Sequence, residues 1–191
     1  MSHKPELGQL RIIAGKWRHR RVTFPDVQGL RPTPDRVRET LFNWLQPYIE
    51  GATCLDLFTG SGALGVEALS RGAGHVVMLE QDPRAIGHLR GQLEALGATA
   101  DEARVIQADA LSYLRGPAET FDVVFVDPPF HTSLIEDSCR LLDQGPWLAP
   151  NARIYLEMAW TPAAPALPAR WRLLHHKRAG DVGYALACVS N

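Results

Sequence analysis

The segment Thr53-Cys54-Leu55-Asp56-Leu57-Phe58-Thr59-Gly60-Ser61-Gly62-Ala63-Leu64-Gly65 joins an apolar strand to a helix through a glycine-rich loop. Apolar, β-branched strands and helices keep alternating after it, which is typical of a parallel sheet covered on both faces. The predicted strands are 53–57, 75–79, 104–107, 121–126, 152–157, 171–175 and 182–189, and the predicted helices are 35–48, 63–70, 83–96, a short one from 110, and 133–142. We therefore expect a doubly wound, Rossmann-like α/β fold.

The length and the cysteine content indicate one domain without covalent or metal staples. At 191 residues, the chain is long enough to bury a core of its own. Its three cysteines are odd in number and far apart, which argues against a disulfide framework or a zinc cluster, and we expect no metal. No apolar stretch approaches the ~18 residues of a membrane span, and the chain starts with polar residues. We expect a cytoplasmic monomer that does not contact a membrane.

The basic residues are concentrated at the beginning of the chain. Residues 1–40 hold nine of the twenty Lys and Arg residues but only four of the twenty-one acidic residues, a net charge of +5. Residues 9–18 and 19–24 read as two strands around a turn at Gly15, which predicts a basic β-hairpin. This charge favours a polyanionic partner, and a solvated terminal arm explains it equally well. We predict a long, flexible extension over 1–34, a domain over 35–191, and RNA contacts from Arg11, Lys16, Arg18, Arg20, Arg21 and Arg31.

The glycine loop follows the first core strand, at the edge where such sheets bind ligands. A Gly-x-Gly-x-x-Gly pattern alone fits a dinucleotide as well as S-adenosylmethionine. Asp56 favours S-adenosylmethionine, because a carboxylate would repel a pyrophosphate but binds the ammonium of a methionine moiety. Glu80 ends the next strand, where it can accept hydrogen bonds from ribose hydroxyls, and Asp109 either faces the adenine or caps a helix. The predicted cofactor-binding residues are Asp56, Phe58, Gly60, Gly62, Glu80 and Asp109.

The tetrapeptide Asp127-Pro128-Pro129-Phe130 follows the most apolar strand of the chain. Two prolines make a stiff loop that exposes carbonyl oxygens, Asp127 adds a carboxylate acceptor, and Phe130 offers a face on which a base can stack. Two acceptors can hold the N–H groups of an exocyclic amine so that its lone pair faces a methyl donor. In isolation, the tetrapeptide is also a common proline-rich turn. Its position in register with the glycine loop favours a catalytic role for all four residues.

Together these segments resemble a known family, the bacterial 16S ribosomal RNA guanine-N2 methyltransferases. The resemblance rests on 11–15, 30–33, 37–43, 56–65, 127–130 and 180–184. It implies a seven-stranded methyltransferase sheet with an antiparallel last strand, an N-terminal β-hairpin, and a flipped guanine as the substrate. It also assigns the glycine loop, Glu80 and Asp109 to the cofactor, and 127–130 to the base. Members commonly carry a glycine where this chain has His19, which leaves the shape of the hairpin turn open.

The resulting prediction is methyl transfer from S-adenosylmethionine to the N2 amino group of a guanine in 16S ribosomal RNA. The expected partner is the small ribosomal subunit or an assembly intermediate, with the base flipped out of its stack. An adenine-N6 methyltransferase is the nearest alternative, because the same loop serves that amine. A nicotinamide-dependent oxidoreductase and a non-catalytic RNA-binding assembly factor are the other two alternatives.

Overall fold

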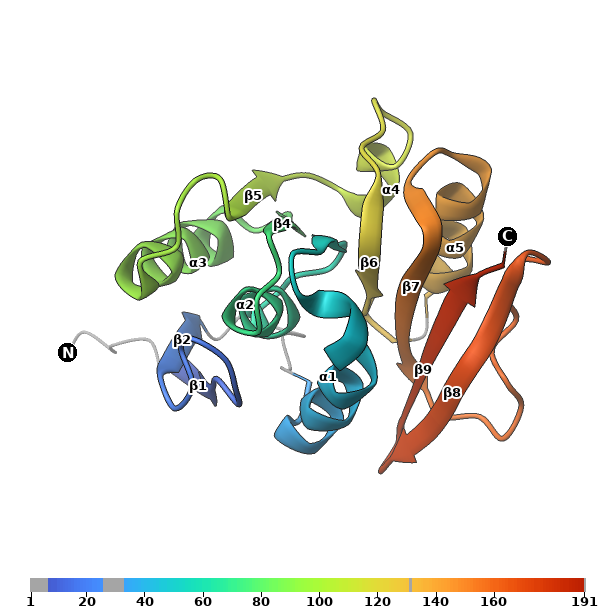
Figure 1. The fold of residues 1–191 in the computed structure, drawn as a ribbon, viewed down its shortest axis with the longest axis horizontal. Coiled ribbons are helices and arrows are strands. Elements are labelled where there is room, and N and C mark those ends of the chain that lie inside the picture. Colours follow the sequence, from blue (N-terminus) through green and yellow to red (C-terminus); the bar gives the residue numbers. More distant parts are fainter. Residues whose placement is uncertain (1–6, 26–32, 131, 191) are drawn as a thin grey trace.

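Seven strands form one mixed sheet, and the first two strands of the chain pair with each other in an antiparallel hairpin (Figure 1). The computed structural model describes residues 7–25, 33–130 and 132–190. The strand order in the sheet is β5-β4-β3-β6-β7-β9-β8, with β9 antiparallel to both of its neighbours. The elements are β1 (Leu7–Arg11), β2 (Arg21–Pro25), α1 (Asp35–Ile49), β3 (Thr53–Asp56), α2 (Ala63–Ser70), β4 (His75–Glu80), α3 (Pro83–Leu96), β5 (Ala103–Gln107), α4 (Ala110–Tyr113), β6 (Phe121–Val126), α5 (Leu134–Gln144), β7 (Leu148–Ala159), β8 (Trp171–Ala179) and β9 (Val182–Val189).

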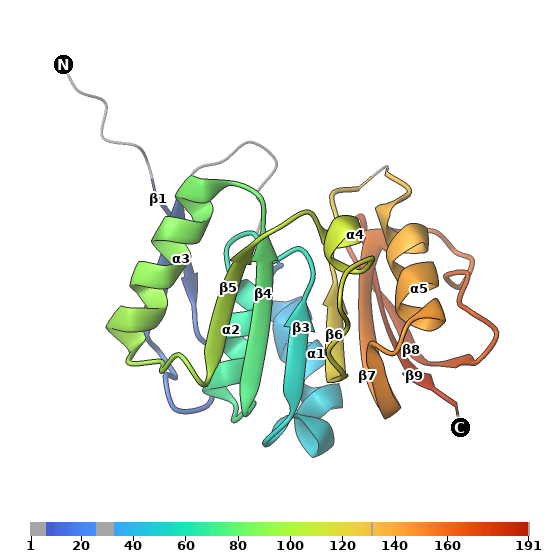
Figure 2. The same cartoon turned by 90° about the horizontal axis from the view of Figure 1, so that it is seen from above.

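Helices cover both faces of this sheet, whose strands are seen side by side from β5 to the β8–β9 pair in Figure 2. On one face, α1, α2 and α3 share an apolar cluster with Val76, Val123 and Phe125. On the other face, α4 and α5 pack against Leu55 and Val124. The predicted doubly wound fold and its antiparallel last strand are confirmed. No helix in the described part of the chain is long and apolar enough to cross a membrane.

Strand β8 extends well beyond its predicted end. It continues from His175 to Ala179, and the added residues include the exposed and basic Lys177 and Arg178. Because β8 is the edge strand of the sheet, pairing with β9 satisfies one side of its backbone while charged side chains remain in water. Apolar periodicity therefore missed this part of the strand.

The N-terminal hairpin has shorter strands and a longer connection than the sequence predicted. Pairing runs from Leu7↔Pro25 to Arg11↔Arg21, so residues 12–20 form the connection. Within it, Gly15 has a φ of +83° and His19 a φ of +69°. This left-handed conformation favours glycine, which is a physical reason for a glycine at the position of His19 in the family that the sequence resembles.

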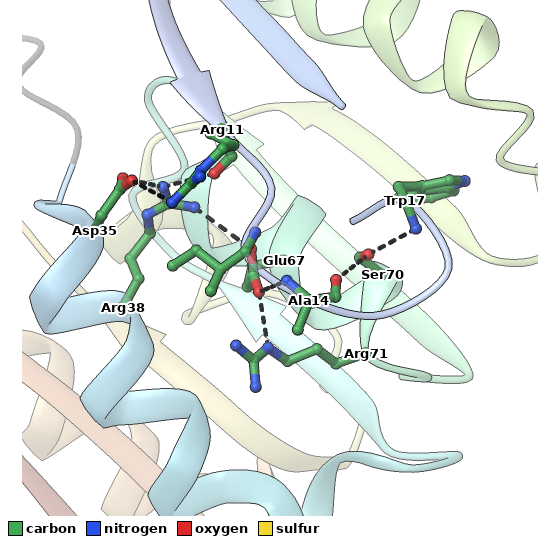
Figure 3. A network of polar contacts seen from close by, with 9 residues as sticks. Arg11, Ala14, Trp17, Asp35, Arg38, Glu67, Ser70 and Arg71 are labelled. Carbon is green, nitrogen blue, oxygen red and sulfur yellow. Dashed lines mark hydrogen bonds and ion pairs between the residues drawn. The ribbon is translucent and has the colours of Figure 1, made fainter. Parts of the chain in front are cut away.

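The connection is fixed to α2 by a buried carboxylate (Figure 3). Glu67 is fully buried and accepts hydrogen bonds from the N–H groups of Ile13 and Ala14, at 2.9 and 3.1 Å. It also accepts one from the buried guanidinium of Arg38, at 3.4 Å. A second nitrogen of Arg38 donates to the carbonyl of Arg11 at 2.8 Å. One buried ion pair thus joins the hairpin, α1 and α2.

Apolar side chains of the hairpin also belong to the main core. Ile12, Trp17, Val22 and Phe24 are buried in the cluster that holds the inner faces of α2 and α3. The prediction of a flexible arm is therefore wrong for residues 7–25, because their backbone and apolar groups pack against the sheet domain. The division between residues 34 and 35 stays a prediction.

Candidate active site

Four acidic residues lie where neighbouring parallel strands end. Asp56 is the last residue of β3, Glu80 is the last residue of β4, and Asp127 directly follows β6. Glu157 lies on β7, directly after Leu156, which forms with Val126 the last residue pair between β6 and β7. Predicted cofactor and substrate residues therefore meet at one edge of the sheet, together with a carboxylate that the sequence analysis did not predict.

Within the described part of the chain, the buried Asp56 carboxyl group has a hydrogen-bond partner at one of its two oxygens. Its Oδ2 accepts a hydrogen bond from the N–H of Gly65 at 3.1 Å, whereas Oδ1 has no hydrogen-bond partner among the described residues. Burial raises the pKa of Asp56 to about 6, because a buried carboxylate loses its hydration, while the nearby Thr59 hydroxyl and the N–H groups of Gly65 and Phe58 favour its charged form. A buried acceptor without a partner fits a cationic group such as the ammonium of S-adenosylmethionine.

Glu80 connects the glycine loop to the end of β4. Its Oε2 accepts a hydrogen bond from the N–H of Gly60 at 3.1 Å. Its Oε1 accepts from the N–H groups of Gln81 and Asp82, at 2.7 and 2.9 Å. These bonds orient the carboxylate and leave it with lone pairs for hydroxyl donors.

Asp109 caps the short helix α4, which is one of the two roles that the sequence left open. Its Oδ1 accepts a hydrogen bond from the N–H of Ser112 at 2.8 Å. Its Oδ2 accepts one from the side-chain amide of Gln81 at 3.1 Å. Gln81 was not predicted, and it joins the loop after β4 to the loop after β5. Contact of Asp109 with an adenine stays a prediction.

Gly62 meets a local requirement of the protein itself. Its φ is +81°, and a Cβ at this position would lie 2.6 Å from Cδ1 of Leu89 on α3. A larger residue would strain the backbone and displace Leu89 before it met any ligand. Phe58, also predicted as a cofactor contact, is half-buried against the cluster on the other face of the sheet.

Asp127 lies among other acidic groups. The hydroxyl of Thr33 donates a hydrogen bond to its Oδ2 at 3.4 Å. The residue before α1 is Pro34, which makes no side-chain cap. Burial raises the pKa of Asp127 well above its usual range, and the charges of Glu157 and Asp56 act in the same direction. A donor or cationic ligand beside Asp127 would favour its ionised form.

Glu157 is the site residue that sequence reasoning missed. Its exposed fraction is 5%, and its Oε2 accepts a hydrogen bond from the buried hydroxyl of Tyr155 at 2.7 Å. Burial raises the pKa of Glu157, while the bond from Tyr155 favours the charged form and lowers it. A signal was present in the sequence, since Tyr155 and Glu157 are alternate polar residues in an apolar strand.

Three residues of the predicted base-binding tetrapeptide line a small hollow at the surface. Pro128, Pro129 and Phe130 contribute to it, and so does the end of β7, from Glu157 to Ala159. Phe130 is 38% exposed, which is high for a phenylalanine beside a core strand. The hollow thus combines an open aromatic side chain with a buried carboxylate.

Five of the six predicted RNA-contacting residues lie on the hairpin, next to α2 and α3 (Figure 1). Arg18 and Arg21 are exposed, and Arg21 donates a hydrogen bond to the side-chain carbonyl of Gln9 at 3.4 Å. The other three described residues have partners in the protein: Lys16 with Glu102, Arg20 with the carbonyl of Ala95 at 2.8 Å, and Arg11 with Asp35 at 4.0 Å. Arg31 lies outside the described residues.

Known proteins resemble this chain over nearly its whole length. The family described as "Conserved hypothetical protein 95" matches residues 10–188. "Ribosomal RNA small subunit methyltransferase D" of Escherichia coli strain K12 is 49% identical over 179 residues, which cover 94% of this chain and 89% of that protein. The protein of the same name from Haemophilus influenzae strain Rd is 48% identical over 182 residues, with 94% and 93% covered. The solved structure "Putative methyltransferase yhhF from Escherichia coli" has a TM-score of 0.89 at 48% identity and covers 96% of this chain and 99% of that one. The chain therefore belongs to the family described as conserved hypothetical protein 95.

Proposed function

We propose that this protein transfers a methyl group from S-adenosylmethionine to the N2 amino group of one guanine in 16S ribosomal RNA. The family and the near-half identity to ribosomal RNA small subunit methyltransferases make the chain an S-adenosylmethionine-dependent methyltransferase of ribosomal RNA. The choice of guanine N2 and of the residues that act is our inference from the site. The substrate would be the small subunit or an assembly intermediate in the cytoplasm.

The cofactor would lie over the ends of β3, β4 and β5. Asp56 would bind its ammonium through the unpartnered Oδ1. Glu80 would accept hydrogen bonds from its ribose, and Asp109 would lie beside its adenine. Gly60, Gly62 and Phe58 would shape the loop around it. The group supplies a methyl on a sulfonium, and its positive charge suits an edge with several carboxylates.

Asp127 and the Pro128 carbonyl would hold the two N–H groups of the substrate amine. This arrangement aims the lone pair of the amine at the methyl group, so catalysis is chiefly orientation and charge stabilisation. Once the N–C bond forms, the amine becomes acidic and one proton passes to the Asp127 carboxylate. Phe130 would stack on the flipped base, and Pro129 would keep the loop stiff.

The observation that favours guanine over adenine is Glu157, a buried carboxylate that lines the same hollow as the 128–130 segment. The edge of guanine carries two adjacent donors, N1–H and N2–H, whereas that of adenine carries a donor beside an acceptor. Asp127 and Glu157 together offer two acceptors to two donors. An ionised Glu157 would face the N1 lone pair of adenine and repel it.

Digestion of methylated product to nucleosides tests this proposal. Small-subunit particles from cells that lack the enzyme are incubated with labelled S-adenosylmethionine, and N2-methylguanosine is the expected product. Label in N6-methyladenine would support the adenine alternative. Cofactor binding without turnover would support a non-catalytic assembly factor, and calorimetric binding of NAD in place of S-adenosylmethionine would support an oxidoreductase.

A Glu157→Gln variant tests the guanine-reading role separately. An amide keeps the size of the side chain but offers a donor as well as an acceptor. We expect kcat/KM to fall by at least tenfold on particles, while the affinity for S-adenosylmethionine stays within about twofold. Unchanged kcat/KM would remove Glu157 from base recognition, and product identity would still report on the proposed reaction.

A further inference from the structure

Two exposed basic residues lie at the same end of the sheet as the candidate active site. Lys177 and Arg178 are near the end of β8, which is antiparallel to β9 and therefore parallel to β7. Arg178 pairs with Gly183, which pairs with Met158 in the wall of the hollow. Two strand spacings, about 10 Å, thus separate the backbone of Arg178 from that wall. Lys177 lies two strands from Glu157 in the same way, through Tyr184.

Aromatic side chains hold both cations in place. The Lys177 Nζ lies 5.6 Å from the ring centroid of Trp44, and the guanidinium of Arg178 lies 5.5 Å from that of Trp160. His175 stacks on Trp44 at 4.5 Å, and His176 stacks on Trp160 at 5.0 Å. Such contacts restrict long side chains before a ligand binds, which lowers the entropy cost of binding.

The charges at this end of β8 are poorly neutralised within the protein. Among the described residues, no carboxylate lies within 4.0 Å of Lys177. Arg178 donates a hydrogen bond to the carbonyl of Gly180 at 2.6 Å, and its carboxylate partner is the exposed Asp181, at 4.0 Å, where an ion pair in water contributes little. By contrast, Lys16 on the hairpin already pairs with Glu102.

We propose that this end of β8, consisting of residues 175–178 with Trp44 and Trp160, is a second RNA-binding surface that contacts phosphates next to the flipped nucleotide. The inference rests on the proposed function. A base in the hollow brings its flanking phosphates to the rim, where Asp127 and Glu157 would repel them. Lys177 and Arg178, which lie on opposite faces of the edge strand, beside Trp44 and Trp160, offset that repulsion from this edge of the sheet. Their aromatic neighbours already carry stacked partners, so the surface suits phosphates better than stacked bases.

The test replaces both cations by uncharged residues of similar length. The double variant Lys177→Gln, Arg178→Gln is compared with Arg172→Gln, which removes one exposed charge from the far end of the same strand. We expect KM for small-subunit particles to rise at least fivefold in the double variant, with kcat and cofactor affinity little changed. The slope of log affinity for a 16S RNA transcript against log salt should fall by roughly 0.7–0.9 for each phosphate that the variant no longer neutralises.

The controls separate this inference from the proposed function. Cofactor affinity equal to that of the wild type shows that the double variant is folded, and Arg172→Gln should leave KM and the salt slope unchanged. If the wild type methylates guanine in the particles but the double variant behaves like Arg172→Gln, the second surface is wrong and the proposed function stands. If the wild type methylates nothing in the particles, the proposed function itself fails.

Discussion

Asp56 is a residue whose burial lowers the stability of the ligand-free protein. Its pKa of about 6 lies above the unfolded value of 3.8, so the folded state binds its proton more tightly. The stabilisation that comes from this tighter proton binding is fully present below pH ~4 and is lost as the pH rises through 6. We therefore expect Asp56→Asn to raise the free energy of unfolding at pH 7.5 by roughly 1–3 kcal/mol and to weaken S-adenosylmethionine binding.

Urea unfolding at two pH values checks this prediction, with calorimetry for the cofactor. The stability difference between Asp56→Asn and the wild type should shrink at pH 4.5, where the buried carboxyl is protonated. A difference that is the same at both pH values would mean that the charge of Asp56 is not the cause.

The protonation of Asp127 should cause the loss of enzyme activity at acidic pH. Burial and the neighbouring Glu157 and Asp56 charges raise its pKa, and only the ionised form can accept two N–H donors and a proton. We expect kcat/KM of the wild type to fall as the pH is lowered through this raised pKa. Asp127→Ala should reduce turnover by roughly 10²–10³-fold and keep its cofactor affinity.

Asp127→Asn is the matched control for that prediction. It keeps one acceptor oxygen at the same place but cannot titrate, so it should retain part of the activity with a flatter acidic limb. An acidic limb as steep as that of the wild type would assign the titration to another group.

Residue-level prediction from the sequence was good where backbone register decides position and poor where tertiary contacts decide it. Asp56 and Glu80 end β3 and β4, Asp127 directly follows β6, and parallel strands bring such residues to one edge. Glu157 ends the predicted strand 152–157, so the same rule could have found it, and the pairing of β7 with β6 places it beside the 127–130 segment. Gln81 became a site residue only through its contact with Asp109.

At the level of elements, the docking of the hairpin onto α2 depends on Gly15. A Cβ there would lie 1.7 Å from the carbonyl oxygen of Ser70, a backbone atom that cannot move aside, and φ is +83°. We expect Gly15→Ala to lower the free energy of unfolding by about 3 kcal/mol or more, since both strain and a clash oppose it. Urea unfolding measures this decrease.

Gly51→Ala provides the comparison, because Gly51 has a φ of +70° but no atom within 4 Å of an added Cβ. It carries the backbone strain without the clash and should cost about 1–2 kcal/mol. Equal decreases in the two variants would mean that the hairpin turn moves away from α2 freely.

The ends of helices and strands were predictable where apolar residues recur at regular spacing. They were not predictable in the edge strand of the sheet, or where a buried polar contact fixes the backbone. Helix α3 and strand β9 have the predicted ends, and both carry a regular apolar face. The hairpin connection does not follow local pattern, because the N–H groups of Ile13 and Ala14 bind Glu67, more than fifty residues away in the sequence. No local signal in residues 9–24 reports that carboxylate.

Across the whole molecule, the hairpin and strand β8 lie on opposite sides of the active-site edge (Figure 1). The hairpin packs beside α3 and α2, and β8 is the far edge of the sheet. A structured RNA that reaches both surfaces would pass over the hollow between them, which suits recognition by shape more than by groove edges. The distribution of charge along the sequence pointed to the hairpin alone. The cations of β8 lie in the part of the chain after residue 40, whose net charge is negative.

If one RNA contacts both surfaces, their contributions to the salt dependence of binding should add. We expect the triple variant Arg18→Gln, Arg20→Gln, Arg21→Gln to lower the salt slope by roughly 0.7–0.9 for each phosphate that these arginines neutralise in the wild type. Combined with Lys177→Gln and Arg178→Gln, the reductions should sum, because the two sites are far apart and share no partner. Fluorescence anisotropy with a labelled 16S RNA transcript at several KCl concentrations measures the slopes, with Arg172→Gln as the reference. A combined variant whose slope equals that of the hairpin triple variant would mean that β8 does not contact the RNA bound by the hairpin, and an unchanged slope in the triple variant would make the hairpin charges a solvated surface.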